Sequence, residues 1–293
     1  MKRVLAAVLA LALPTLAAAD PGPPTIAIII DDLGHSLEAG RRVAALPGPV
    51  ACAVLPHTPR ARDVADAAHA AGKEVLLHLP LEPQEADGGP DPGGIVLDMT
   101  RRELARSFDA SLASVPHVVG VNTHRGSLLT RHPGHMSWLM EEILARGNLV
   151  FVDSYTTADS VALGIAREQG VPAVKRDVFL DHDPTPATVE REFARLKRLA
   201  RDEGMAVAIG HPHAATLAML ERELPRLEKE GFRLVGIRDY VQLAGQAGNP
   251  GAAPAIQSAT RSAIRSTARP ASGAAIPATP SALDTANNTW RTP

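Results

Sequence analysis

The sequence has 293 residues, 45% of them hydrophobic, so it is long enough to bury a core the size of one α/β barrel. Its formal net charge is -2, which shows no basic excess. We therefore expect no nucleic-acid partner, because holding a phosphate backbone requires a concentration of Lys and Arg. Cys52 is the single cysteine, so an internal disulfide is excluded and packing must hold the fold.

The N-terminus has the three parts of a secretory signal peptide, namely a charged start, an apolar run and small residues before a cleavage point. They are Met1 to Arg3, Val4 to Leu16, and Ala17 to Ala19. A retained membrane anchor is the alternative, but the apolar run is too short to span a bilayer and contains Pro14. We predict a signal peptide over 1–19, a periplasmic or otherwise exported location, and no stable membrane span after cleavage.

From about residue 245 onward the composition changes to Ala, Pro, Ser and Thr, with few large apolar residues. Such a segment cannot bury enough surface to offset the entropy of ordering it. We therefore predict one folded domain over 20–244 and a disordered tail over 245–293. No pattern in the sequence indicates the oligomeric state.

Short β-branched runs alternate with helical patterns throughout the predicted domain. Predicted strands cover Thr25–Ile30, Val50–Leu55, Glu74–Leu79, Val118–Val121, Leu149–Val152, Ala173–Leu180, Met205–Ile209 and Arg233–Ile237. Predicted helices cover Ser36–Ala45, Pro59–Ala71, a segment beginning at the capping box of Thr100 and Glu103, His135–Arg146, Ser160–Gln169, Ala187–Asp202 and Ala214–Glu230, the last kinked at Pro225. This alternation indicates a parallel sheet, either closed as a barrel or open and doubly wound.

Most of the predicted strands run into an Asp, Asn or His residue at their carboxyl ends. These residues are Asp31, Asp32, His57, His78, Asn122, His124, Asp153, Asp181, His211 and His213. Side chains at the carboxyl ends of successive parallel strands converge on one face of a sheet. The sequence therefore predicts a polar site on that face.

Some of these residues also have a purely structural interpretation. Asp31 and Asp32 could cap the helix that follows them, since Asp is a favoured N-cap residue. Adjacent carboxylates repel each other unless a cation or a shared proton neutralises them, which favours a bound divalent metal. His78 could be a buried core histidine, whereas His124 lies in a polar turn with a glycine that can aim its ring into the site.

At these residues the sequence resembles the divergent polysaccharide deacetylase family, a distant branch of the carbohydrate esterases. The similar stretches are Ile29 to Gly34, Leu77 to Pro83, Gly120 to Ser127, Phe151 to Ser154, Arg176 to Asp181 and Ala208 to His213. Together they extend over the whole predicted domain. The resemblance implies an α/β fold of one domain, a distorted (β/α) barrel with parallel strands.

The resemblance also implies roles for several residues. Asp31 is the expected catalytic base, and His211 is the expected acid that protonates the leaving group. Asp32 and His124 are expected ligands of a divalent metal, with zinc as the first candidate. His78 is our candidate for the third ligand because of its position at a strand end.

Several positions depart from the expected patterns, among them Thr123 and Arg125, where the family usually carries Asn and Met. Leu128 stands one helical turn after the first histidine, where ordinary polysaccharide deacetylases carry a second one, and Tyr155 stands where the family usually has Arg. The remaining polar residues are expected to contact the substrate, although Asp in such positions can also stabilise turns. These residues are Asn122, Ser127, Asp153, Asp181 and His213.

The signal peptide and the predicted metal site favour an exported, metal-dependent hydrolase that removes acetyl groups from an envelope polysaccharide or related glycan. One alternative is a non-catalytic envelope module that binds carbohydrate or another partner through the same barrel. Another is a metal-dependent hydrolase of a different substrate. Aromatic residues make up only 3% of the chain, which weakens the carbohydrate part more than the hydrolase part.

Overall fold

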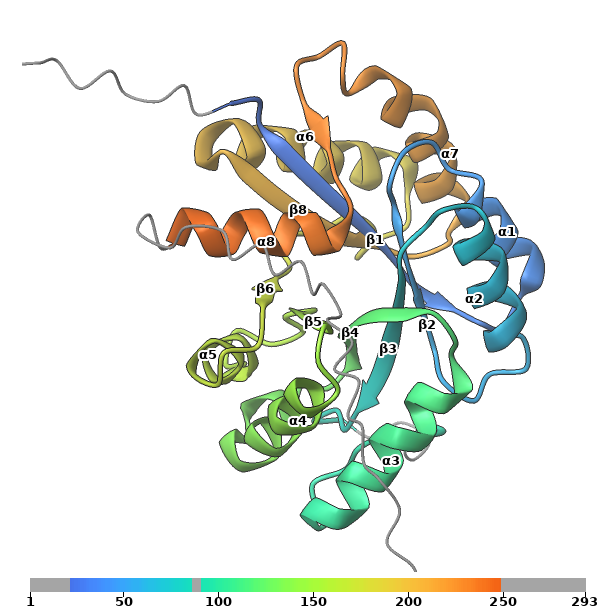
Figure 1. Cartoon of the computed structure of the whole chain (residues 1–293). Coiled ribbons are helices and arrows are strands. Elements are labelled where there is room, and N and C mark those ends of the chain that lie inside the picture. The colour runs from blue at the N-terminus through green and yellow to red at the C-terminus, as the bar shows by residue number, and fades with distance from the viewer. Residues whose placement is uncertain (1–21, 86–90, 249–293) are drawn as a thin grey trace, which may run out of the picture. The chain divides into compact units, whose positions relative to one another are not determined.

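The computed structural model describes residues 22–85 and 91–248, in which strands and helices alternate along the chain (Figure 1). The strands are β1 (Thr25–Leu33), β2 (Ala51–Val54), β3 (Val75–Leu81), β4 (Val118–Arg125), β5 (Val150–Asp153), β6 (Ala173–Lys175), β7 (Val178–Phe179), β8 (Met205–Gly210) and β9 (Arg233–Leu234). The helices are α1 (Leu37–Ala44), α2 (Ala61–Ala70), α3 (Arg101–Ser114), α4 (Pro133–Ala145), α5 (Ala162–Glu168), α6 (Pro186–Glu203), α7 (Ala214–Glu223) and α8 (Ile237–Gly248), with short 3-10 turns η1 (Leu129–Arg131) and η2 (Leu224–Arg226).

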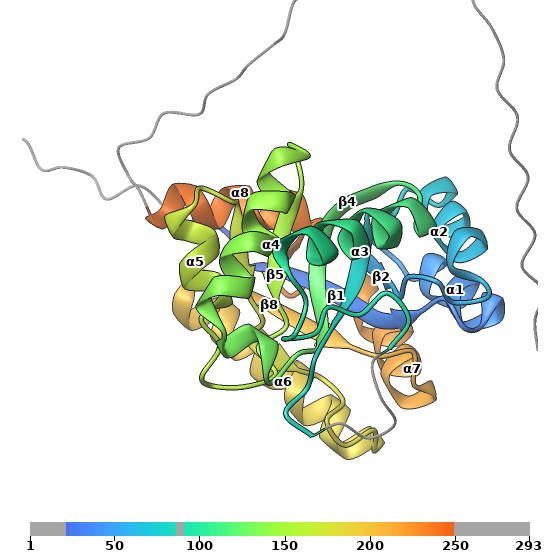
Figure 2. The same cartoon turned by 90° about the horizontal axis from the view of Figure 1, so that it is seen from below.

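The strands form one curved parallel sheet, and helices surround its outer face (Figure 2), whereas α8 packs against the inner face. Neighbouring strands follow the order β6-β5-β4-β3-β2-β1-β8-β7, and β9 pairs with the first residues of β1. This architecture confirms the distorted (β/α) barrel. Among the described helices, none is both long and apolar enough to cross a membrane.

The barrel closes through one short segment that changes its partner strand. β6 pairs with β5, β7 pairs with β8, and only residues 176 and 177 separate them. The Arg176 N–H donates to the Asp153 carbonyl at 2.9 Å, and the Asp177 N–H donates to the Val207 carbonyl at 3.0 Å. The strand predicted over Ala173–Leu180 is therefore divided in two, because its halves bond to opposite edges of the sheet.

Local signals account for several helix boundaries. Thr100 is the N-cap of α3, and its side chain and that of Glu103 form the predicted capping box. Pro225 lies in η2 directly after α7, so the predicted kink is a change to a 3-10 turn. The strand predicted over Arg233–Ile237 is shorter than expected, because Ile237 already begins α8.

Successive residues of β1 alternate between two apolar layers, as the geometry of a strand requires. The outer layer includes Ile26, Ile28 and Ile30, which are buried with apolar residues of the surrounding helices. The inner layer includes Ala27 and Ile29 and is completed by buried residues of α8, namely Ile237, Tyr240 and Val241. The helix α8 thus fills the amino end of the barrel interior, and the carboxyl end is left for polar side chains.

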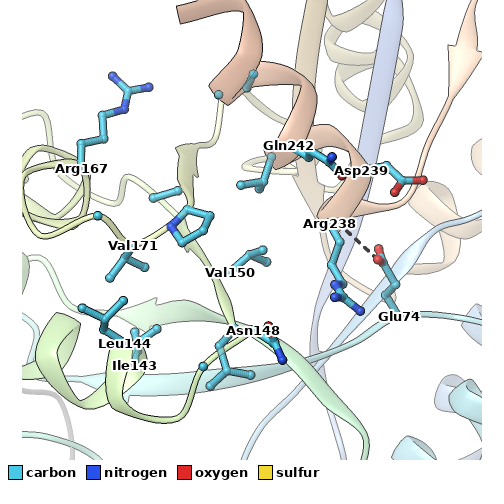
Figure 3. Close-up of a pocket in the computed structure, with 18 residues that line it drawn as sticks. Glu74, Ile143, Leu144, Asn148, Val150, Arg167, Val171, Arg238, Asp239 and Gln242 are labelled. Atoms are coloured by element: carbon cyan, nitrogen blue, oxygen red, sulfur yellow. Dashed lines mark hydrogen bonds between the residues drawn. The ribbon is translucent and has the colours of Figure 1, made fainter. Parts of the chain in front are cut away.

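A cavity of about 1200 Å³ opens at the amino ends of β5 and β6 (Figure 3). Val150 and Val171 contribute apolar surface to it, while Glu74 and Arg238 lie on the side of α8. Because the polar strand-end residues lie at the carboxyl ends of the strands, this cavity is separate from the predicted site.

The predicted signal peptide lies outside the described residues, as do residues 249–293 of the predicted tail. The domain boundary predicted at residue 245 stays a prediction, and α8 continues to Gly248.

Candidate metal and acid-base site

Asp31 and Asp32 are neighbours on β1, and both carboxylates reach the same site because the strand is irregular there. On a regular strand, adjacent side chains point to opposite faces. The register of β1 against β2 shifts between Ile30 and Leu33, and Asp32 has a φ of 57°. Non-glycine residues adopt this left-handed conformation infrequently. The bulge turns the carboxylate of Asp32 to the side where Asp31 is buried.

Three possible metal-ligand atoms from β1, β3 and β4 form a triangle. Asp32 Oδ1 lies 3.0 Å from His124 Nδ1 and 3.2 Å from His78 Nε2, and the two nitrogens are 3.1 Å apart. Ligand atoms around a tetrahedral zinc ion, with bonds of about 2.0–2.1 Å, lie about 3.3 Å from one another. The spacing of the triangle therefore fits a single small divalent ion.

The electrostatics of the triangle also fit a cation. Asp32 Oδ1 is buried and accepts no hydrogen bond from any described residue, a situation that costs free energy. Burial raises the pKa of Asp32, but the adjacent His124 and His78 outweigh it and hold that pKa well below its usual range. An ionised oxygen whose near polar neighbours are two imidazole nitrogens is an arrangement that a divalent metal would satisfy.

Asp31 lies beside the triangle. Its Oδ2 is 3.6 Å from His78 Nε2, and its Oδ1 accepts a hydrogen bond from Asn122 Nδ2 at 2.8 Å. Burial raises the pKa of Asp31, and the opposing effects of His78 and His211 do not cancel this rise. A carboxylate with a raised pKa is suited to accept a proton near neutral pH.

His211 follows β8, the neighbour of β1, and its Nε2 lies 3.6 Å from Asp32 Oδ2. Its Nδ1 is 2.9 Å from Asp181 Oδ1, and its backbone N–H donates to Asp181 Oδ2 at 2.6 Å. Since an ionised carboxylate only accepts hydrogen bonds, Nδ1 carries a proton and Nε2 is directed into the site. Burial lowers the pKa of His211, but the hydrogen bond to Asp181 and the negative charges of Asp31, Asp181 and Asp32 together outweigh burial, so the net pKa is raised.

Asp153 and Ser127, two of the residues predicted to contact substrate, form hydrogen bonds within the protein. Asp153 is buried and accepts hydrogen bonds from the Tyr155 N–H at 2.9 Å and from the Ser160 hydroxyl at 2.7 Å. It thereby holds the turn after β5. The Ser127 hydroxyl accepts a hydrogen bond from the Gln84 N–H at 2.9 Å.

His213 is exposed at the start of α7, and its ring centre is 5.8 Å from that of His211. With Asp181 these histidines form a second group whose possible ligand atoms lie within 4.8 Å of one another. The oxygens of Asp181 already accept bonds from His211 and from the Thr216 hydroxyl at 2.7 Å. The first triangle is therefore the better metal site, because its carboxylate oxygen faces only the two imidazoles that would be its fellow ligands.

Arg176 was not singled out from the sequence, although it lies in one of the family-like stretches. Its guanidinium donates to the carbonyls of Ser154 at 2.7 Å and Tyr155 at 2.9 Å, and lies 4.7 Å from the ring centre of Phe179. Burial lowers the pKa of Arg176, and the charge of Asp31 is the largest opposing effect. This cation lies where the chain changes strands, so a pattern based on strand ends does not detect it.

Residues 28–241 match the profile of a family described as divergent polysaccharide deacetylase. The chain belongs to this family. It is 38% identical over 217 residues to the uncharacterized protein YibQ of Escherichia coli, a match that covers 74% of this chain and 66% of YibQ. It is 36% identical over 212 residues to an uncharacterized protein of Haemophilus influenzae, covering 72% of this chain and 75% of the relative. The chain thus spans slightly less than two thirds of the length of YibQ.

The fold of this family member is also similar to a solved structure. The crystal structure of an uncharacterized protein from Agrobacterium tumefaciens superposes with a TM-score of 0.71 at 24% identity, covering 76% of this chain and 91% of the other. This similarity concerns the fold alone. In this chain the third corner of the triangle comes from His78 on β3, whereas Leu128 immediately precedes η1.

Proposed function

We propose that this chain is an exported, metal-dependent hydrolase that removes acetyl groups from an envelope polysaccharide or related glycan. The observation that carries the proposal is the triangle of Asp32, His78 and His124, flanked by Asp31 and His211. Membership of the divergent polysaccharide deacetylase family supports a carbohydrate substrate. The signal-like pattern of residues 1–19 supports export.

In this proposal Asp32, His78 and His124 hold the divalent metal. Two imidazole nitrogens and one carboxylate oxygen suit zinc, and three protein ligands leave a coordination position open, as catalytic zinc sites require. When bound, the ion supplies Lewis-acid polarisation of the acetyl carbonyl and lowers the pKa of water.

Asp31 and His211 carry the proton transfers. Asp31 accepts a proton from the attacking water, which its raised pKa favours. His211 donates a proton from Nε2 to the departing amine or alcohol, while Asp181 holds the ring through Nδ1. Each such transfer typically accelerates a reaction by about 10²–10⁴-fold. The carboxylate lies on β1 and the imidazole directly follows the paired strand β8, so base and acid stand next to each other beside the metal ligands.

The test compares zinc content with acetate release in the full chain. Wild type loaded with zinc should release acetate from peptidoglycan or from N-acetylated chitooligosaccharides. Asp31→Asn should retain zinc but lose activity, because the amide keeps the shape of the carboxyl and cannot accept the proton. Asp66→Asn is the matched control, since Asp66 is exposed and pairs with His117, and it should keep both properties.

Two outcomes would overturn the proposal. Wild type that takes up no zinc would remove the metal centre. A zinc-loaded wild type that binds these glycans without releasing acetate would favour the non-catalytic envelope module.

Export is tested separately by sequencing the N-terminus of protein recovered from the cell envelope. We expect it to begin at or near Asp20, since Ala17 to Ala19 have the form of a cleavage site. Intact Met1 on that protein would contradict cleavage.

A further inference from the structure

The side-chain amide of Asn122 joins the proposed base to a proposed metal ligand. Asn122 is fully buried on β4 and pairs in register with His78 on β3. Its Nδ2 donates to Asp31 Oδ1 at 2.8 Å, and its Oδ1 is 2.9 Å from His78 Nδ1. Nδ2 also lies 3.4 Å from the Ser154 hydroxyl. Both ends of the amide are therefore used inside the protein, whereas the sequence led us to expect a contact with substrate.

The chemistry of these groups determines the direction of each hydrogen bond. An ionised carboxylate only accepts, so the NH₂ end of the Asn122 amide faces Asp31. The oxygen end then faces His78, and because an amide oxygen only accepts, His78 Nδ1 must be the donor. A neutral imidazole that is protonated on Nδ1 has its lone pair on Nε2. This is the nitrogen that lies 3.2 Å from Asp32 Oδ1, at a corner of the triangle.

We propose that Asn122 is a positioning residue whose amide keeps His78 in the tautomer that binds metal through Nε2 and, at the same time, orients Asp31. This inference rests on the proposed metal-dependent function. Groups that accept the second N–H of a metal-bound histidine typically change metal affinity by about 10–100-fold when they are removed. One buried amide thus connects two parts of the site that the sequence places on β1 and β3.

The test measures zinc dissociation constants of the full chain by competition with a chelator, for wild type and two variants. Asn122→Leu is similar in volume but forms neither hydrogen bond, so zinc should bind about 10–100-fold more weakly. Asn122→Asp still accepts from His78 Nδ1 but cannot donate to Asp31. It should therefore bind zinc within about threefold of wild type, while kcat for acetate release falls at least about tenfold with little change in KM.

A spectroscopic measurement separates positioning from general loss of structure. In zinc-loaded protein labelled with ¹⁵N-histidine, His78 should show a slowly exchanging Nδ1 proton in wild type and in Asn122→Asp. That signal should be absent from Asn122→Leu. Its disappearance from the spectrum of His78→Ala identifies it as the signal of His78.

Thr123→Val is the matched control, because Thr123 is the buried neighbour on β4 and accepts a hydrogen bond from the Ser154 N–H at 3.3 Å. Thr123→Val should lower thermal stability and leave the zinc dissociation constant and the Nδ1 proton signal of His78 unchanged. Equal zinc binding by wild type and Asn122→Leu would overturn the inference and leave the proposed function intact. Wild type that binds no zinc would overturn both. If Asn122→Leu does not fold, weak zinc binding by a folded Asn122→Asp would overturn the inference.

Discussion

Asp181 holds both the ring and the backbone of His211. One carboxylate oxygen is 2.9 Å from the imidazole Nδ1, and the other accepts the His211 backbone N–H at 2.6 Å. The ring is thereby fixed in position with Nε2 directed towards Asp32, 3.6 Å away. Because Asp181 lies outside the triangle, its loss should impair proton donation without removing the metal.

Asp181→Asn should reduce acetate release by about 10²–10⁴-fold, with zinc content unchanged. The amide places its own donor where the carboxylate now accepts, so the ring of His211 loses its partner or turns. Thr216→Val, which removes one hydrogen bond to Asp181, should have a much smaller effect. Rates are measured under zinc saturation. If the pair acts as a unit, the double variant with His211→Ala should be no slower than His211→Ala alone, and multiplicative losses would refute this.

His124→Ala should sharply lower the zinc content of purified protein, because losing one of three ligands leaves too little binding energy to hold the ion. His213→Ala is the control, since His213 belongs to the second group and lies outside the triangle. Elemental analysis after dialysis against a weak chelator measures both. Equal zinc in His124→Ala and wild type would exclude His124 as a ligand, and loss only in His213→Ala would place the metal in the second group.

Glu74→Gln should change how stability depends on pH. Glu74 accepts hydrogen bonds from the Ile237 and Arg238 N–H groups at the start of α8. Burial raises the pKa of Glu74, and these hydrogen bonds lower it by less. A carboxyl group whose pKa is raised on folding stabilises the fold while it is protonated, and this contribution is lost as the pH rises through the folded pKa.

The melting temperature of Glu74→Gln should therefore equal that of wild type at about pH 4 and exceed it at pH 7. Circular dichroism during heating measures the difference. The control is Glu228→Gln, because Glu228 is exposed. The difference in melting temperature between this variant and wild type should be the same at both pH values. A lower melting temperature for Glu74→Gln at pH 7 would show that the N-terminus of α8 stabilises the carboxylate by more than its burial costs.

Gly120→Ala should destabilise the barrel, because a Cβ at this position of β4 would lie 2.6 Å from Val150 Cγ2 and 2.8 Å from the Val150 carbonyl oxygen. Overpacking of this kind typically costs about 1–3 kcal/mol. Gly164→Ala in α5 is the matched control, since its Cβ would meet no atom within 4 Å, and it should stabilise by about 0.5–1 kcal/mol. Chemical denaturation measures both, and an unchanged midpoint for Gly120→Ala would mean that β5 can shift to make room.

Local patterns were sufficient to predict a parallel α/β sheet and the face on which its polar side chains gather, while the distorted barrel was predicted from the family resemblance. Alternating strands and helices require a parallel sheet, and the carboxyl ends of parallel strands share one face. The ends of β1, β3, β4 and β8 therefore had to bring Asp31, His78, His124 and His211 to one region. The capping box at Thr100 could also be predicted from the sequence, because the interactions that form it span only four residues.

Only the tertiary structure decided which atoms meet in the site. The bulge that turns Asp32 inward depends on the register of β1 against β2, and the contact between His78 and Asn122 depends on that of β3 against β4. Arg176 comes near enough to Asp31 for the two charges to interact because its strand changes partners where the barrel closes. Register between strands is determined by packing across the whole sheet, so these contacts could not be derived from the residues that precede and follow each one in the chain.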